Sequence, residues 1–249
     1  MKPNRSLLAS VLLVCFSTGA AWSQNEGNQA NCSGLPTAGQ LKQFLATAPR
    51  DGGGDAGGLF HGTLMWAAVV NRSGQLCAFA TSTADPTKVW PGSQGIAKAK
   101  AFTANAFSND ALPLSTARLY TFIQPGHSLY GLNNSNPFNA DFLAPPSGEG
   151  GGTGAVAGGI ITFGGGVALY NSRGHIVGGL GISGDTACTD HEIAKRVRDE
   201  AGLNPPGGST VDDILYSGVD PASPFAHPLC PNTFRNGTFI GTERNASSY

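Results

Sequence analysis

The sequence predicts an α/β fold, a sandwich in which one antiparallel sheet is backed by helices. Two apolar segments, "VVNRSGQLCAF" and "LYNSRGHIVGG", each turn at an Asn-x-x-Gly tetrad, a pattern typical of β-hairpins. Helical patterns lie between the two hairpins and after the second one. Hairpins that alternate with helices in this way favour a single sheet with a helical layer against it.

Residues 1–23 are predicted to be a secretory signal peptide and not part of the fold. Lys2 and Arg5 precede a short apolar run from Leu7 to Phe16, and small residues follow as far as Ser23. This is the order found in signals that are cleaved, here near Ser23, and the run is too short to span a bilayer. We therefore expect a periplasmic or secreted protein.

The composition is that of a loop-rich exported domain. Only 12% of the residues are charged, whereas the chain has 36 Gly and 16 Pro. The net charge of −1 provides no basic field for nucleic acid, and no other apolar run predicts a membrane span. Four cysteines follow the signal, and in an oxidising compartment they predict two disulfides, with the pairing left open among Cys32, Cys77, Cys188 and Cys230.

The remaining elements are predicted in chain order. Residues 24–60 contain a helix, with apolar residues at helical spacing within Gly34–Ala48, and then a Gly-rich link. The alanine-rich segment Gly92–Phe107 predicts a helix on which Lys98 and Lys100 cannot share a face. A second helix is expected around Leu114–Phe122.

The triple glycine Gly164–Gly166 lacks the context of a phosphate-binding loop. Such a loop leads from a strand directly into a helix, whereas a strand pattern follows Gly166. The glycines instead predict close backbone packing beside a pocket. A helix is expected after them, and Thr189 and Glu192 have the Thr-x-x-Glu spacing of a capping box, with a cap from Thr186 as the alternative. The acids and histidine at 190–192 could otherwise ligate a metal.

Five segments, in order along the chain, resemble the GlcG/HbpS-like haem-binding protein family. They are "AAVVNRSGQLCAF", "GSQGIAKAKAFTANAF", "IQPGHSLYGL", "ITFGGGVALYNSRGHIVGGLGISG" and "DHEIAKRV". The resemblance implies a five-stranded antiparallel sheet in a profilin-like or sensor-like sandwich, haem as cofactor, and a homo-oligomer. It places the family domain at residues 61–202, with an insertion at 134–159 and a Pro/Gly-rich C-terminal extension at 203–249.

Haem binding requires an axial donor, an apolar slot and partners for the propionates. His127, in "QPGHSLYG", is the first candidate ligand of the haem iron, and His61, in the Gly-rich link, is the second, with exposed loop histidines as the alternative interpretation. The candidates for the slot and the propionates are Tyr130, Phe163, Trp66, Lys98 and the backbone of Gly164, Gly165 and Gly166.

Three functions are compatible with these residues. The first is an exported haem-binding protein for haem capture, buffering, or redox or iron sensing. The second is an enzyme acting on a small anionic organic substrate of a catabolic pathway, with Lys98, His127 and Asp190 in the same pocket. The third is a structural role in an oligomer. Because the sequence has no nucleophile elbow, zinc motif or paired-carboxylate signature, we favour the binding protein.

Overall fold

The computed structural model describes residues 31–50, 53–142 and 153–245, so the predicted signal peptide lies outside the described residues. Its centre is an antiparallel sheet in the order β2-β1-β4-β3. The strands are β1 (Trp66–Asn71), β2 (Leu76–Thr81), β3 (Gly166–Tyr170) and β4 (Ile176–Ser183). Both predicted hairpins are present, and they join where β1 pairs with β4. The fold class is confirmed, although this sheet has four strands among the described residues and not the five that the family resemblance implies.

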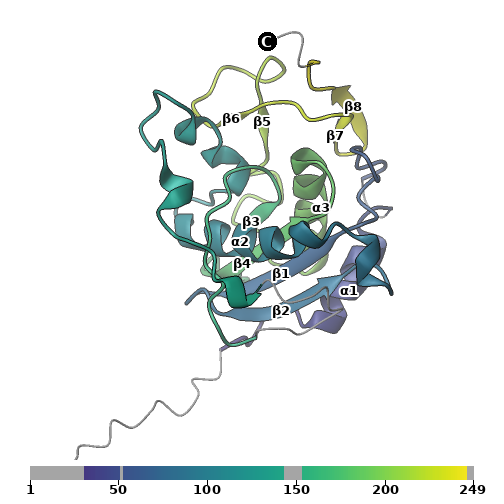
Figure 1. Cartoon of the computed structure of the whole chain (residues 1–249), viewed down its shortest axis with the longest axis vertical. Helices are drawn as coiled ribbons and strands as arrows, with labels where there is room; N and C mark the ends of the chain where they lie inside the picture. Colours follow the sequence, from purple (N-terminus) through teal and green to yellow (C-terminus); the bar gives the residue numbers. More distant parts are fainter. Residues whose placement is uncertain (1–30, 51–52, 143–152, 246–249) are drawn as a thin grey trace, which may run out of the picture.

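Helices cover both faces of the sheet (Figure 1). They are α1 (Ala38–Thr47), α2 (Pro91–Phe107) and α3 (Ala187–Glu200). On one face, Ala97 and Ala101 of α2 pack against strand residues such as Phe79. On the other face, Leu41 of α1 and Ile193 of α3 pack against the alternate strand residues. The strands are therefore buried on both sides, which explains their almost continuous apolar sequence.

Glycines in β4 allow α2 to lie directly on the sheet. A Cβ atom on Gly181 would collide with the carbonyl oxygen of Ala97, and a Cβ atom on Gly179 would collide with the carbonyl oxygen of Ala101. Any larger residue at these positions would push the helix away from the sheet, because protein interiors are already close-packed. The glycines of "IVGGLGIS" thus set the distance between α2 and β4.

The prediction of a single helix around Leu114–Phe122 is wrong. This segment forms two short 3-10 helices, η2 (Thr116–Leu119) and η3 (Thr121–Ile123). Tertiary hydrogen bonds hold it in this form, since the Thr116 hydroxyl donates to the Phe163 carbonyl oxygen at 2.6 Å and accepts from the Gly166 amide at 2.9 Å. A polar side chain that bonds to a distant strand in this way overrides a weak local preference for helix.

The start of α3 also differs from the capping-box prediction. The helix begins at Ala187, and Thr186 is its N-cap, with a side chain that accepts from the Thr189 amide at 3.3 Å. The prediction of a capping box formed by Thr189 and Glu192 is therefore wrong, and the alternative prediction of a cap from Thr186 is confirmed. Because Glu192 lies well inside the helix, its carboxylate forms ion pairs one turn further on, with Lys195 at 2.9 Å and Arg196 at 3.1 Å.

The C-terminal extension passes beside α3 (Figure 1), and two of its acidic side chains form ion pairs with charged residues of the helix. Arg198 forms an ion pair with Asp212 at 2.6 Å, and Lys195 forms one with Asp213 at 2.8 Å. Removing either partner of such a buried pair leaves an uncompensated charge. The extension contains two small sheets formed by β5 (Leu215–Tyr216), β6 (Ala226–His227), β7 (Thr233–Arg235) and β8 (Thr238–Gly241).

The described parts of the predicted insertion, residues 134–142 and 153–159, lie against α2 and the edge strand β2. The Leu76 amide donates to the Ala155 carbonyl oxygen at 2.9 Å, and the Gly154 amide donates to the Leu76 carbonyl oxygen at 2.8 Å. Gly159 approaches Ala99 so closely that a Cβ atom on the glycine would lie 2.9 Å from the alanine methyl group. This segment therefore covers an edge that would otherwise have unpaired backbone groups.

Both predicted disulfides are present. Cys32 pairs with Cys77, which ties the N-terminal segment to β2, and Cys188 pairs with Cys230, which ties the extension to the start of α3. Two formed disulfides indicate an oxidising compartment. Among the described residues, no helix has the length and apolar character needed to cross a membrane.

The contact between α2 and β4 gives a direct test of the packing. Gly181→Ala should lower the free energy of unfolding by about 1–3 kcal/mol, because the added methyl group forces α2 away from the sheet. Urea denaturation followed by circular dichroism measures this change. Gly39→Ala is the control, since Gly39 is an exposed position of α1 with open space around it. Equal denaturation midpoints for the two variants would contradict the proposed contact.

Candidate functional site

The candidate site is centred on the start of α3, where this helix meets the loop that precedes β1. Asp185 accepts hydrogen bonds from the backbone amides of Leu59 at 2.6 Å, Phe60 at 2.8 Å and Gly62 at 3.2 Å. Charge-assisted bonds from three amides to one buried carboxylate fix the path of the backbone. We call residues 57–62 the His61 loop.

The His61 loop has an unusual backbone conformation. His61 itself has a φ of +53°, in the left-handed region that residues other than glycine rarely adopt. Gly58 and Gly62 on either side of it both have a φ of +74°, and a Cβ atom on Gly58 would collide with the side chains of Asp185 and Thr189. Non-glycine residues with this conformation cluster at functional sites, where the surrounding structure holds them in place.

The imidazole of His61 is oriented by a carboxylate. Its Nδ1 lies 2.9 Å from Asp55 Oδ1, and the side chain is 60% exposed. The pKa of Asp55 is lowered, first by a hydrogen bond from the Gly57 amide and then by the bond to His61. Asp55 is therefore ionised at neutral pH and accepts a hydrogen bond from the Nδ1–H group of His61, so Nε2 is the ring nitrogen that this carboxylate does not contact.

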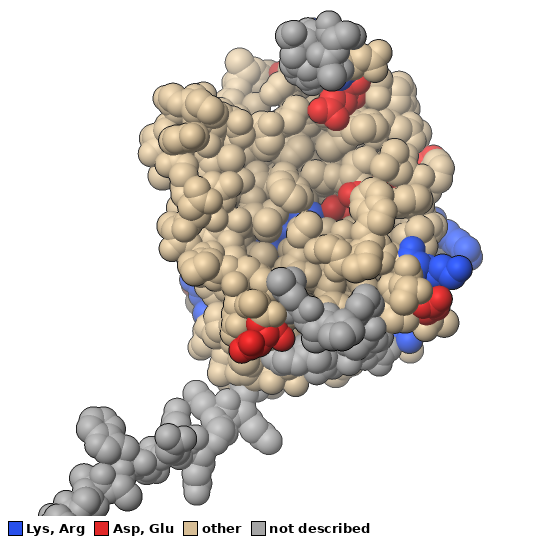
Figure 2. Space-filling view, in the orientation of Figure 1, with Lys and Arg blue, Asp and Glu red and all other residues tan. Residues whose placement is uncertain are grey.

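Large apolar side chains of the His61 loop, and Trp90 against one of them, are partly exposed. Leu59 is 53% exposed and Trp90 is 47% exposed, although both are large and hydrophobic. The rings of Phe60 and Trp90 meet edge to face, with centroids 5.2 Å apart. Figure 2 shows one face of the molecule with few charged side chains, some near its margin and some in a central hollow. A partly exposed aromatic pair that includes the chain neighbour of an oriented histidine is a surface that suits a flat apolar ligand.

The first turns of α2 extend this apolar surface into a groove. Trp90 is the N-cap of α2 and forms no side-chain capping hydrogen bond. Beyond it, a groove of about 300 Å³ lies between α2 and the segments around residues 136 and 160. Its apolar lining includes Gly92, Ile96, Ala99, Phe138, Ile160 and Ile161. This volume lies at the lower end of the range for small-molecule sites.

A buried ion pair underlies the site. Lys100 Nζ lies 2.7 Å from Asp190 Oδ2 and 3.0 Å from the Ile182 carbonyl oxygen, and both side chains are almost fully buried. Gly165 makes room for the pair, since a Cβ atom there would lie 2.7 Å from Lys100 Nζ. The absence of side chains in the triple glycine therefore allows α2 and α3 to come close together, with Gly164 against the Ala187 carbonyl group. The close backbone packing predicted for these glycines is present.

Desolvation affects both members of this pair. Burial raises the pKa of Asp190 to about 6, against the opposing effect of the Lys100 charge. Burial also lowers the pKa of Lys100. The other carboxylate oxygen of Asp190 accepts from the Asp185 amide at 2.9 Å, so this acid is fully occupied in holding the start of α3.

The structure does not bring the residues of the enzyme hypothesis into contact. Lys98 Nζ is buried, donates to the Phe142 carbonyl oxygen at 3.1 Å and lies 4.3 Å from the centre of the Phe79 ring. Asp190 is paired with Lys100. His127 lies on an exposed turn, and its ring makes no side-chain hydrogen bond in the described part of the chain. The three predicted residues therefore have separate surroundings.

The other predicted residues of the haem slot have different environments. Tyr130 is 69% exposed, on the same exposed turn as His127. Phe163 is half-buried, with its ring centre 4.9 Å from Lys100 Nζ. Trp66 is buried in the core and stacks on Phe79, so it does not line an open surface.

Three residues important to the site were not predicted from the sequence. Asp55 bonds to the Gly57 amide and to the His61 ring, whereas Asp185 bonds to backbone amides of the His61 loop. Lys100 forms an ion pair with Asp190. One sequence signal could have identified Lys100. It lies two residues from Lys98 on a predicted helix, so the two lysines point to different sides of the helix and need different partners. No spacing rule connects Asp185 to a loop more than 120 residues earlier.

The family assignment follows from the sequence around this site. Residues 59–199, more than half of the chain, match the family model described as "Haem degrading protein HbpS-like". The chain belongs to the HbpS-like family. The matched region contains Lys100, Asp185, Asp190 and the His61 loop from Leu59 onward. Asp55 and the C-terminal extension lie outside it, so this HbpS-like protein orients His61 with a residue beyond the matched region.

Curated relatives and solved structures are similar to parts of this HbpS-like chain. The corrinoid adenosyltransferases PduO of Citrobacter freundii and Salmonella typhimurium are each 34% identical over 103 residues, which is 41% of this chain and 23% of PduO. The chain thus spans about a quarter of the length of these relatives. A PduOC–haem complex has a TM-score of 0.45 at 24% identity, covering 67% of this chain and 93% of PduOC. Klebsiella pneumoniae protein ORFY has a TM-score of 0.46 at 22% identity, covering 67% and 90%.

The Lys100–Asp190 pair leads to a stability prediction. Lys100→Met and Asp190→Asn should each lower the free energy of unfolding by about 3–5 kcal/mol, because either change leaves one buried charge without its partner. The double variant should lose less than the sum of the two single losses. Urea denaturation of the four proteins measures the coupling. Lys98→Met is the matched control, because Lys98 is also buried on α2 but has no carboxylate partner among the residues that the structure describes. A loss for Lys98→Met equal to that for Lys100→Met would contradict the role of the pair.

Two buried histidines predict a specific pH dependence. Burial lowers the pKa of His227 to about 4 and lowers that of His191 well below its usual range. In the unfolded chain these rings take up protons near pH 6.5. Their contribution to stability is therefore complete above pH 6.5 and is lost as the pH falls through about 4.

The comparison of wild type with His227→Phe isolates this effect. The urea midpoint of the wild type should fall more steeply between pH 7 and pH 4.5 than that of the variant, because the variant lacks one of the two protonations. Parallel pH profiles would show that His227 does not titrate differently in the folded and unfolded states.

Proposed function

We propose that this HbpS-like protein is an exported haem-binding protein in which His61 supplies the axial ligand of the haem iron. The observation that carries the proposal is the pair formed by His61 and Asp55. Histidines that ligate metals almost always donate their second ring N–H to a carboxylate, a backbone carbonyl group or water, which fixes the tautomer and the ring orientation. His61 has this arrangement, with Nδ1 held at 2.9 Å by Asp55 on a side chain that is exposed to solvent.

The surroundings of His61 fit the remaining needs of haem. Leu59, Phe60 and Trp90 provide apolar contact area for a flat macrocycle. The first turn of α2 begins at Pro91 without a side-chain cap, so its free amides and helix dipole suit a propionate. Bound haem supplies an iron centre for ligand binding or electron transfer, while the His61 loop supplies the ligand and its orientation.

The structure favours His61 over His127, which the sequence placed first. His127 is exposed but has no carboxylate or carbonyl partner for its ring among the described residues. His175 has a partner, Asp110, at 2.8 Å, but no exposed aromatic pair is associated with it in the described structure. His61 alone among these three combines an oriented ring with an apolar surface and with backbone strain.

The family supports haem as the ligand. Residues 59–199 match a family described as haem-degrading, and the His61 loop begins at the first matched residue. Haem capture, buffering, and redox or iron sensing all begin with the binding step proposed here. The curated relatives are corrinoid adenosyltransferases, and a corrinoid is also a flat macrocycle with a central metal, so it is the second ligand to test.

We also propose that the protein acts in the periplasm or outside the cell. The two disulfides support an oxidising compartment, and the N-terminal sequence supports export with cleavage near Ser23. A homo-oligomer is proposed from the family resemblance. The mass of the protein purified from its native compartment tests the cleavage, and light scattering tests the oligomer.

Haem titration tests the proposed ligand. Hemin added to the wild type should give a Soret band with the position expected for histidine ligation, and His61→Ala should remove this spectrum. Asp55→Asn should weaken the affinity about 10–100-fold, because it removes the group that orients His61. Titration with a corrinoid under the same conditions shows which macrocycle binds more tightly.

The chain offers two matched controls for this experiment. His175→Ala removes a histidine of almost equal exposure, 62% against 60%, that is also paired with an aspartate. His127→Ala removes the candidate ranked first from the sequence. Neither variant should change the Soret spectrum. A normal spectrum in His61→Ala, or its loss in either control, would overturn the assignment of His61.

A further inference from the structure

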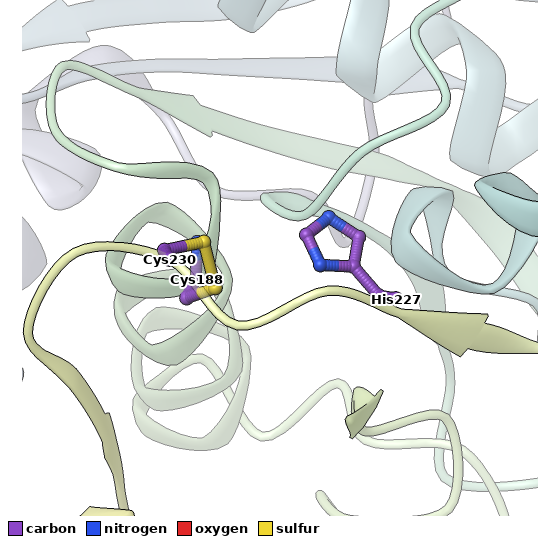
Figure 3. Close-up of side chains that lie close together, drawn as sticks. All are labelled: Cys188, His227 and Cys230. Carbon is purple, nitrogen blue, oxygen red and sulfur yellow. A yellow bond between two sulfur atoms is a disulfide. The ribbon is translucent and has the colours of Figure 1, made fainter. Parts of the chain in front are cut away.

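A cluster of three potential metal ligands contains none of the residues of the His61 loop, although the loop is hydrogen-bonded to Asn232, two residues after one of these ligands. Cys188, His227 and Cys230 are all buried, and their ligand atoms lie within 4.8 Å of one another (Figure 3). Cys188 is in the first turn of α3, His227 is in β6, and Cys230 follows three residues later. The two sulfur atoms form a disulfide, so the cluster in this state offers one ligand, the imidazole.

We propose that reduction of the Cys188–Cys230 disulfide converts this cluster into a site for a thiophilic divalent metal ion such as Zn²⁺. Two thiolates and one imidazole are a ligand set that zinc uses in proteins, with water or a substrate in the fourth position. This inference is independent of the proposed haem function, because it uses none of the residues of the His61 loop.

The separation of the ligands suits such an ion. Thiolates bound to zinc at about 2.3 Å in tetrahedral geometry lie about 3.8 Å apart. The Cα atoms of Cys188 and Cys230 are 5.9 Å apart. Rotation about the side-chain bonds can therefore separate the sulfur atoms after reduction, with little movement of the backbone. Packing around the two cysteines, from Ala117, Ile214 and Tyr216, holds the two segments together.

The surroundings also favour thiolates. Cys188 is at the positive end of α3, where the helix dipole and free amides stabilise a sulfur anion. Its own amide lies 3.1 Å from Cys230 Sγ, so one N–H group already points at the second sulfur. These contacts provide the hydrogen bonds that tune metal–thiolate sites.

His227 is suited to be the neutral third ligand. Burial holds its pKa at about 4, so the ring has a free lone pair at neutral pH. Nδ1 is 2.7 Å from the Pro228 carbonyl oxygen, and Nε2 is 3.4 Å from the Gly164 amide. Metal binding therefore requires the ring to turn, or its proton to move to the other nitrogen. Neither change introduces a charge into the core.

The redox step is a balanced thiol–disulfide exchange. A dithiol reductant attacks one sulfur of the disulfide through a thiolate, and a mixed disulfide forms. The second thiol of the reductant then displaces the protein sulfur, so the reductant becomes a disulfide and the protein gains two electrons and two protons as two thiols. When one divalent ion binds, both thiol protons are released.

The second disulfide of the chain is an internal control. Cys32 and Cys77 form a bridge of similar sequence separation, 45 against 42 residues. No third histidine, cysteine or carboxylate ligand completes a cluster around Cys32 and Cys77 within the described residues. Reduction of that bridge provides two thiols but not the proposed site.

Cobalt spectroscopy of the purified exported chain tests the proposal. The parent protein carries Cys32→Ser and Cys77→Ser, and a phosphine is the reductant because dithiols themselves bind metal. One equivalent of Co²⁺ should give an intense sulfur-to-cobalt charge-transfer band in the reduced parent and none in the oxidised parent. Adding Cys230→Ser should abolish the band, and adding His227→Phe should weaken Co²⁺ binding on the order of 100-fold.

Three results would overturn the proposal. One is the absence of a charge-transfer band in the reduced parent. Another is equal Co²⁺ affinity in the parent and in its His227→Phe variant. The third is an equally strong band in a reduced Cys188→Ser/Cys230→Ser variant that retains Cys32 and Cys77. Circular dichroism accompanies each titration, and a reduced parent that unfolds and does not refold with Zn²⁺ or Co²⁺ also contradicts the proposal.

Discussion

The ion pair between Lys100 and Asp190 connects the two helical layers at the edge of the sheet. Lys100 comes from α2 and Asp190 from α3, and they meet beside Gly165. Asp190 also accepts from the Asp185 amide, and Asp185 in turn holds three amides of the His61 loop. Charge-assisted hydrogen bonds thus connect a buried lysine, through Asp190 and Asp185, to the backbone amides on either side of His61. In the low dielectric of the interior each of these bonds is strong, and each depends on the others being formed.

The C-terminal extension belongs to the same packing unit. α3 has charged residues on the side that faces away from the sheet, and a helix with this pattern would normally be exposed to solvent. Here Asp212 and Asp213 of the extension neutralise Arg198 and Lys195. Both helix residues and Asp212 are buried, and Asp213 is mostly buried, so the extension supplies the partners of charged side chains that the helix alone would leave unpaired.

The sequence was most informative where the apolar pattern is local. The two hairpins, α1 and α2 were predicted because periodicity and turn residues act over a few positions. The predictions of a capping box at the start of α3 and of a helix at 114–122 were wrong, since Thr186 and Thr116 are placed by contacts that the local pattern does not encode. The residues that orient His61 were missed for the same reason. The link from Asp185 to Leu59 is purely tertiary, and the His61–Asp55 contact depends on a left-handed backbone.

The positions of the disulfides have a consequence for the chain as a whole. Cys32–Cys77 lies entirely before the insertion at 134–159, and Cys188–Cys230 lies entirely after it. A single cut within the insertion would therefore give two halves, each crosslinked internally and neither covalently linked to the other. The halves would be held together by the β1–β4 ladder and by α2 against the glycines of β4. The two halves are therefore comparable to the subunits of a heterodimer, and two separately expressed fragments could associate through this central interface.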